Sequence, residues 1–193
     1  MKIRPYRKED KPAIEQICIS SILQGELDKN FDTKDLFVKI WISAYLNGQS
    51  KDSIVVEDQG KVVGYLICSV NCSLLFIIRI IFIFIREFLI KNKQSIKCLF
   101  DLMREISILK NGAHFQLNLK NGYKSQKIGH KLIHSFEKKC KEKNITQWYT
   151  IVFAHSSQGS LRFYERLGLR VFRKKQIAAI EDLTIVYLVK RIT

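Results

Sequence analysis

A short basic loop between an apolar run and an amphipathic run carries the clearest chemistry in this sequence. Residues 118–136 are NLKNGYKSQKIGHKLIHSF, a predicted strand end, a loop with Lys124 and Lys127, and a predicted helix beginning near Gly129. The first N–H groups of a helix lack partners within the helix, and the helix dipole is positive there. We therefore expect a phosphate-bearing ligand at this loop. The alternative is an Asn-Gly turn with solvated lysines and a glycine that packs the helix on a sheet.

A tyrosine about 30 residues further along could serve as a proton donor. Residues 156–169, SSQGSLRFYERLGL, place Tyr164 on a short predicted helix with Ser157 as its N-cap and Gly168 just after its end. A phenol with an ordinary pKa of about 10 can protonate a leaving thiolate of similar or lower pKa. The competing interpretation is a half-buried core tyrosine.

Together, these two segments resemble the GNAT superfamily of acetyl-CoA-dependent N-acetyltransferases. The family motif V-x-P-x-Y-R-G-x-G-I-G corresponds to LKNGYKSQKIG at residues 119–129, and the later N-x-x-A-x-x-F-Y-E-x-L-G-F corresponds to SQGSLRFYERLGL at residues 157–169. The Phe-Tyr-Glu-x-Leu-Gly match is the specific part. The opening IRPYRKEDKPAI is also similar to the family's first strand and helix, so that the resemblance covers most of the chain.

The resemblance implies a fold, a cosubstrate and a set of site residues. The fold would be α/β, a mixed and mostly antiparallel sheet with helices on both faces and one splayed parallel strand pair. Acetyl-CoA would lie between the splayed strands, with Tyr164 protonating the coenzyme A thiolate as a primary amine attacks directly. The residues implied in coenzyme binding are Leu117, Asn118, Leu119, Lys124, Ser125, Gln126, Lys127, Ile128, Gly129, His130, Ser157 and Ser160.

Three positions depart from the family pattern. Lys127 stands where the family has its first glycine of G-x-G, Asn121 where it has proline, and Ser157 where it often has asparagine. These departures motivate an alternative function, a non-catalytic acyl-CoA-binding or interaction module on the same fold. Such an anion site depends more on backbone N–H groups than on the identity of the glycine, so we favour coenzyme binding despite these departures.

The base that deprotonates the acceptor amine is open at this level. In the family, the loop between the first two helices borders the acceptor cleft, which makes Glu26 and Asp28 candidates. His114 lies on the strand that lines the cleft and has an ordinary pKa of about 6.5. The alternative for His114 is a strand histidine that faces solvent or a neighbour. Sugar amines, polyamines, peptide N-termini and lysine all remain candidate acceptors.

Hydrophobic periodicity supplies the elements that must position these residues. The inner face of the helix at residues 127–143 should contain Ile128, Leu132, Ile133, Phe136 and Cys140. The whole chain, residues 1–193, is expected to be one domain. Predicted strands cover residues 2–6, 53–57, 61–70, 113–119, 146–154, 169–175 and 183–191; predicted helices cover residues 8–23, 33–46, 127–143 and 158–167.

Residues 72–112 form a predicted helical insertion with unusual composition. Residues 74–90, LLFIIRIIFIFIREFLI, contain only Arg79, Arg86 and Glu87 as charged residues. A spanning helix needs about 20 residues with almost no charge, so we do not expect a simple transmembrane segment. An apolar helix must still be covered, and we expect it to wall a pocket or form a homodimer contact. A membrane surface is the alternative.

The overall charge and the cysteines limit the partners. The net charge of +15 suggests an anionic ligand or surface, although a solvated lysine-rich surface explains it as well. No basic repeat with interleaved aromatics occurs, so the sequence does not favour nucleic acid as a partner.

The cysteines and the start of the sequence indicate the compartment. Five cysteines without a C-x-x-C pair or a suitably placed histidine predict reduced thiols and no metal site. With no signal-like apolar run at the start, we expect a cytoplasmic protein, with membrane-peripheral attachment as the alternative.

Overall fold

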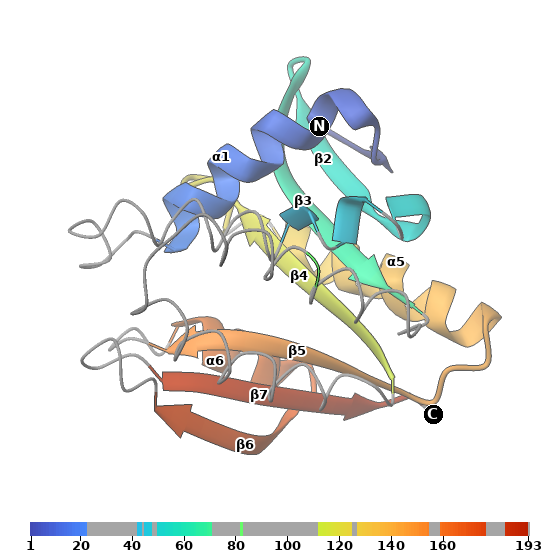
Figure 1. Cartoon of the computed structure of the whole chain (residues 1–193), viewed down its shortest axis with the longest axis vertical. Helices are drawn as coiled ribbons and strands as arrows, with labels where there is room; N and C mark the ends of the chain where they lie inside the picture. The colour runs from blue at the N-terminus through green and yellow to red at the C-terminus, as the bar shows by residue number, and fades with distance from the viewer. Residues whose placement is uncertain are drawn as a thin grey trace.

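The centre of the protein is a seven-stranded mixed sheet, seen in a computed structural model in the order β1-β2-β3-β4-β5-β7-β6 (Figure 1). The structure describes residues 1–22, 42–43, 45–47, 50–70, 82, 112–124, 127–154, 159–176 and 184–192. Neighbouring strands are antiparallel except for β4 and β5, which are parallel. This arrangement confirms the predicted fold class.

The element bounds agree closely with the periodicity of the sequence. The first strand ends at Pro5, one residue earlier than predicted. The helix that was predicted to begin near Gly129 begins at Ile128. The strands are β1 (Lys2–Pro5), β2 (Ile54–Asp58), β3 (Lys61–Ser69), β4 (Ala113–Leu119), β5 (Gln147–Ala154), β6 (Arg170–Gln176) and β7 (Thr184–Arg191). The helices are α1 (Lys11–Ile22), α5 (Ile128–Glu142) and α6 (Gly159–Arg166), with short 3-10 turns at Lys8–Asp10 and Ser50–Asp52.

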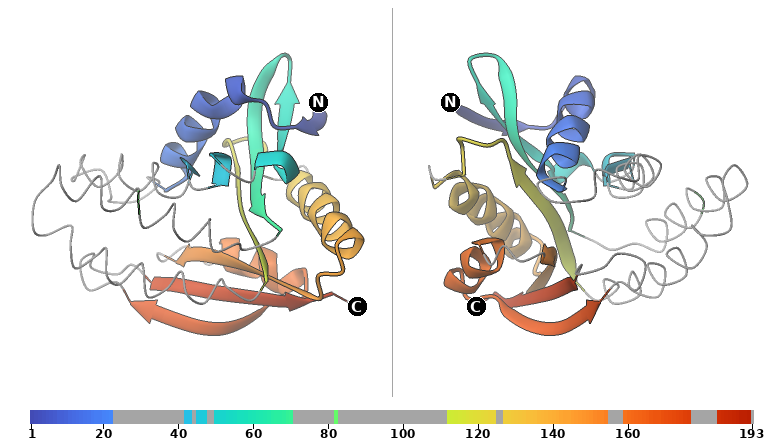
Figure 2. Two further views of the ribbon diagram at one scale, coloured as in Figure 1. Left: turned by 45° about the vertical axis from the view of Figure 1, so that its right-hand side comes forward. Right: turned by 90° about the vertical axis from the view of Figure 1, so that its left-hand side faces the viewer.

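Helix α5 covers one face of the sheet and α1 covers the opposite face (Figure 2). The predicted inner face of α5 is confirmed, since all five of its residues are buried in one apolar cluster with the sheet. Side chains alternate between the faces of a strand, so Phe115 and Leu119 of β4 point toward α5. On the other face, α1 buries Ile14, Ile17 and Cys18.

A buried ion cluster ties β1, β2 and the start of α1 together. The Arg4 guanidinium donates from both terminal nitrogens to the two Asp10 carboxylate oxygens, each at 2.8 Å, and from Nε to Glu57 at 2.6 Å. The Arg7 backbone N–H donates to Asp10 at 2.7 Å. Asp10 thus lies just before α1, and its carboxylate accepts hydrogen bonds from Arg4 and from the Arg7 backbone.

Replacing Asp10 by Asn should destabilise the protein by about 2 kcal/mol or more at pH 7, because it leaves a buried guanidinium without its main counter-charge. The hydrogen bond from Arg4 holds the pKa of Asp10 below its ordinary value, and burial opposes this only in part. A lowered folded-state pKa means that Asp10 contributes fully above about pH 4 and less as the pH falls further. Urea unfolding at pH 7 and pH 3 measures this, and the difference between wild type and Asp10→Asn should shrink at pH 3. An equal difference at both pH values would contradict this role.

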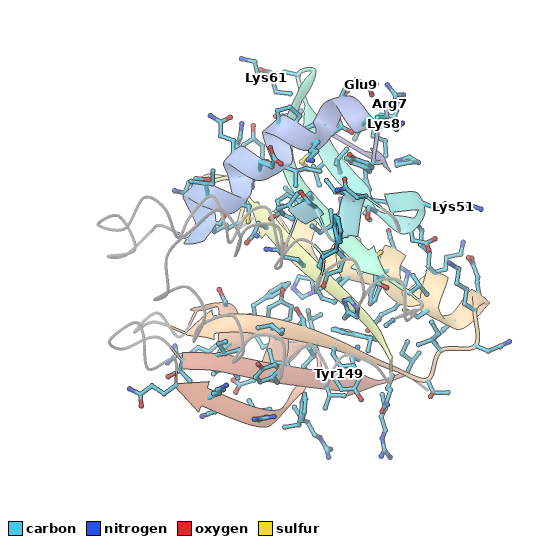
Figure 3. The ribbon with its side chains drawn as sticks, in the orientation of Figure 1. Arg7, Lys8, Glu9, Lys51, Lys61 and Tyr149 are labelled. Carbon is cyan, nitrogen blue, oxygen red and sulfur yellow. The ribbon has the colours of Figure 1, made fainter. Side chains whose placement is uncertain are left out.

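Several predicted features lie outside the described residues. They include most of the second helix, Glu26 and Asp28, and nearly all of the insertion at residues 72–112, of which only Phe82 is described inside residues 74–90; its side chain is 68% exposed. Among the described helices, none has the length and apolarity needed to cross a membrane. The labelled basic side chains Arg7, Lys8, Lys51 and Lys61 project outward around the upper part of the fold (Figure 3).

Candidate active site

The two parallel strands β4 and β5 part after a short paired stretch and leave a wedge between them. They pair from Ala113 with Trp148 to Phe115 with Thr150 and no further. Beyond that point β4 continues to pair with β3 up to Leu119, and β5 continues to pair with β7 up to Ala154. Figure 1 shows the two strands diverging from their paired ends. The splayed pair predicted from the resemblance is therefore confirmed.

The backbone of β4 presents hydrogen-bonding groups to this wedge. The Thr150 hydroxyl of β5 donates to the Phe115 carbonyl oxygen at 3.2 Å, so the peptide groups of Phe115 point toward β5. Backbone groups along a strand point to alternate sides, which places those of Leu117 and Leu119 on the wedge side as well. On the other edge, the Lys120 N–H donates to Val63 of β3, which fits this alternation.

Tyr164 lies at the vertex of the wedge. It is 6% exposed, its ring centre is 6.3 Å from that of Phe115, and its hydroxyl is hydrogen-bonded to Thr150. Burial raises the pKa of Tyr164 well above its ordinary value, and the bond with Thr150 opposes this only in part. The phenol therefore keeps its proton throughout the physiological range, as a proton donor must.

The N-terminus of α5 follows the C-terminal end of β4 and lies at the open side of the wedge. The first helical hydrogen bond there runs from the Lys131 N–H to the Lys127 carbonyl at 3.3 Å, which leaves the preceding N–H groups without a helical acceptor. Lys127 is the N-cap and has φ +56° and ψ +14°, the left-handed conformation that glycine adopts readily. The structure thus keeps the backbone shape of a glycine at the position where the family has one.

Replacing Lys127 by Gly should stabilise the protein by about 1 kcal/mol, since a residue with a Cβ costs about 1–2 kcal/mol in the left-handed region. Lys127→Ala is the matched control, because it removes the ammonium and keeps the Cβ. Thermal unfolding of the two variants separates backbone strain from charge. A Lys127→Gly protein no more stable than Lys127→Ala would show that the loop is not strained there.

Gly129 links the two motifs of the sequence by close packing. A Cβ at Gly129 would lie 2.8 Å from Cζ of Phe163 on α6, closer than side-chain contacts allow. The His130 ring also meets Phe163 edge-on, with centres 5.2 Å apart. The sequence alternative that Gly129 packs its helix is therefore correct, but the partner is α6, not the sheet. This contact fixes the first turn of α5 relative to α6, the helix that carries Tyr164.

The loop before α5 is held to the β2–β3 hairpin. Gly122 has φ +87° in a turn closed by the Tyr123 N–H, which donates to the Lys120 carbonyl at 3.1 Å. The Tyr123 hydroxyl donates to Asp58 at 3.0 Å. The Asn-Gly turn therefore forms, and the hydrogen bond from Tyr123 to Asp58 holds it against the hairpin. The helix expected to follow this loop is also present, so the two interpretations of the segment do not exclude each other.

The candidate base His114 is in a different environment from the one expected. It is 1% exposed, and its Nδ1 is 2.6 Å from the Tyr45 hydroxyl. Burial lowers the pKa of His114 to about 3. The ordinary pKa expected for His114 is therefore wrong, and of the two surroundings that the alternative left open the ring has a neighbour, Tyr45. At neutral pH this imidazole is a weak proton acceptor. Glu26, the other candidate, lies outside the described residues.

The sequence interpretation missed Gln116, Cys18 and Tyr65, which lie near the wedge around the predicted residue Asn118. Gln116 donates from Nε2 to the Cys18 sulfur at 3.6 Å, and Asn118 donates to the Tyr65 hydroxyl at 2.7 Å. Tyr65 and Cys18 are also hydrogen-bonded to each other. The polar alternation of the strand FQLN could have revealed Gln116 and Asn118 as one face, but nothing in the sequence placed Cys18 and Tyr65 beside them.

The remaining residues predicted to bind the coenzyme differ in exposure, and some of them lie outside the described residues. Lys124, Lys127, His130 and Ser160 are exposed around the two helix N-termini, while Ile128 and Gly129 are buried. Ser125, Gln126 and Ser157 lie outside the described residues. Gly168 ends α6 as predicted, with φ +83° and its N–H bonded to the Glu165 carbonyl at 2.9 Å.

Comparison with known proteins matches this geometry to a family. Residues 105–180 match the family model described as an acetyltransferase (GNAT) domain. Among curated proteins, no sequence matches the chain significantly. The fold resembles the crystal structure of SsHAT, with a TM-score of 0.72, 17% identity and coverage of 98% of this chain and 97% of that one.

Two further structures are similar at lower scores. Ard1 from Thermoplasma volcanium has a TM-score of 0.64 and 13% identity, with 100% of this chain and 97% of that chain covered. A ribosomal-protein-alanine N-acetyltransferase from Brucella melitensis has a TM-score of 0.61 and 13% identity, with both chains fully covered at 100%. Residues 105–180 therefore match an acetyltransferase (GNAT) domain model, and the chain has the fold of these structures around a splayed β4–β5 pair.

Proposed function

We propose that this protein transfers the acetyl group of acetyl-CoA to a primary amine by direct attack. The observation that carries the proposal is the wedge that opens beyond Phe115 and Thr150, with Tyr164 at its vertex. The GNAT family match supports acyl transfer in general. The wedge supports a long, thin cosubstrate because one edge of it is a strand with inward-pointing peptide groups.

In this proposal, the two ends of the cosubstrate are held by different parts of the site. The peptide groups of Leu117 and Leu119 would pair with the pantetheine amides as an extra strand would. The unpaired N–H groups at the start of α5 would bind the diphosphate, with Lys124 and Lys127 adding charge. The anchored turn at Tyr123 positions that end of the loop.

The chemical step needs a proton at the leaving sulfur. The amine would attack the thioester carbonyl and release one proton to water, and the C–S bond would then break to give an amide and a coenzyme A thiolate. Tyr164 would donate its proton to that thiolate and regain one from water afterwards, which matches a buried phenol that is protonated at neutral pH. A group that only filled the core would not need a hydroxyl at the vertex of the wedge.

Binding of coenzyme A can be tested by thermal unfolding. At 100 times its dissociation constant, the coenzyme should stabilise the protein by about 2.7 kcal/mol. Release of free thiol from acetyl-CoA, followed with a panel of primary amines, then tests transfer. Stabilisation without thiol release would favour the non-catalytic acyl-CoA-binding module. The absence of both effects would contradict the proposal.

A further inference from the structure

The face of β4 opposite Tyr164 carries a closed cluster of neutral polar side chains. Gln116 directly follows Phe115, the last β4 residue paired with β5, and its side chain points to the α1 side. Cys18 and Tyr65 are fully buried there, and Asn118 completes the cluster at the next position of the same face. If the thioester lies in the wedge with Tyr164 on one side, an attacking amine must come from the side of Gln116.

One atom in this cluster lacks the partner that burial demands. The Gln116 Oε1 atom is buried, and among the described residues no donor is within hydrogen-bonding reach of it. Leaving a buried carbonyl oxygen unsatisfied costs folding free energy, so native structures seldom keep one without a reason. Its neighbours are already engaged, since Gln116 Nε2 is bonded to Cys18 and Asn118 Nδ2 to Tyr65. An N–H donor arriving from the wedge would satisfy Oε1.

In the described part of the chain, the titratable groups that face Gln116 are Cys18, Tyr65 and His114, and all three are uncharged at neutral pH. Burial raises the pKa of Cys18 to about 11 and also raises that of Tyr65, so neither ionises. His114, two residues before Gln116 on the same face, is neutral beside Tyr45 because burial lowers its pKa. The nearest described carboxylate is Glu15 of α1, which acts on Cys18 from a partly exposed position and pairs with Lys11 at 3.9 Å. An ammonium ion entering this cluster would lose its hydration and would gain no counter-charge from the residues that the structure describes there.

Resting on the proposed function, we propose that the acceptor is a weakly basic primary amine, of the α-amino type, which enters in its neutral form and donates an N–H to Gln116 Oε1. An α-amino group of pKa about 7.8 is about one quarter neutral at pH 7.4, whereas a lysine-like amine of pKa about 10.4 is neutral in only about one molecule in a thousand. The stronger nucleophilicity of the more basic amine recovers part of this difference. We therefore expect kcat/KM to favour the α-amine by about 30- to 300-fold.

The test compares glycine amide with n-propylamine, two small acceptors of similar size, by thiol release from acetyl-CoA. At pH 7.4 the kcat/KM for glycine amide should exceed that for n-propylamine by about 30- to 300-fold. Its kcat/KM should level off above about pH 8, while that of n-propylamine should rise about tenfold per pH unit up to about pH 10, following the neutral fraction of each amine. Equal rates for the two amines at pH 7.4, or parallel pH profiles, would overturn the inference.

A charge-changing variant provides a second measurement. Gln116→Glu keeps the shape of the side chain and places a carboxylate at the cluster, so it should shift the preference toward n-propylamine by at least about tenfold. Gln116→Met, without charge, is the matched control and should lower kcat/KM for both amines without shifting the preference. Stabilisation by coenzyme A shows whether each variant is folded. An unchanged preference in folded Gln116→Glu would contradict a role for this residue.

The outcomes also separate this inference from the proposed function. Thiol release that favours n-propylamine would overturn the acceptor class and leave acetyl transfer in place. Coenzyme binding without thiol release from either amine or any other would overturn both.

Discussion

Replacing Tyr164 by Phe is expected to slow thiol release by about ten- to a thousandfold while leaving coenzyme binding intact. The substitution removes only the hydroxyl that is bonded to Thr150 at the vertex of the wedge, and the ring keeps its contact with Phe115. The thiolate would then have to take its proton from water. Single-turnover measurements of thiol release isolate this step from binding and product release.

Tyr149→Phe is the matched control for this substitution. Tyr149 is also on β5, but it lies at the paired end of the strand, opposite His114, and its ring contacts Phe172 at 5.6 Å (Figure 3). It should therefore show the wild-type rate. A Tyr164→Phe protein with wild-type single-turnover kinetics would show that Tyr164 is a structural residue only.

Replacing Gly129 by Ala is expected to destabilise the protein by about 2 kcal/mol, because the added Cβ would overlap the ring of Phe163. The direction of this change in unfolding free energy is informative, because packing and helix propensity predict opposite effects. Helix propensity alone predicts that Gly→Ala in a helix stabilises by up to about 1 kcal/mol. Displacement of the first turn of α5 should also weaken coenzyme A binding by about tenfold or more. Thermal unfolding and coenzyme titration measure the two effects.

The contact with Phe163 can be tested by a double-mutant cycle. Phe163→Leu removes the ring atoms that the new Cβ would meet, so the double variant should be more stable than the sum of the two single changes predicts. Recovered coenzyme binding in the double variant would link the position of α5 to the site. Additive losses would place the cause of the Gly129 effect elsewhere.

Local pattern determined much of this protein. The inner face of α5, the hairpin of β2 and β3 and the turn after α6 all follow from periodicity and from glycine position, which depend on short-range geometry. The same holds for the exposed N–H groups of the segment at Lys127, since any helix start leaves its first N–H groups without a helical acceptor. The resemblance then identified Tyr164, and the structure places it at the vertex of the wedge.

Tertiary packing decided the features that depend on residues far apart in the chain. A histidine on an alternating strand has an ordinary pKa until burial against Tyr45 removes it from water, which no local pattern shows. The partner of Gly129 is 34 positions away on α6, and the neighbours of Gln116 come from α1 and β3. Sequence alone thus determined one strand, one turn and one helix start in the order that the resemblance associates with a thioester carrier, because each of them depends on neighbouring residues. The surroundings of Gln116 were decided only when the fold brought α1, β3 and β4 together, because their electrostatics arise from contacts between elements.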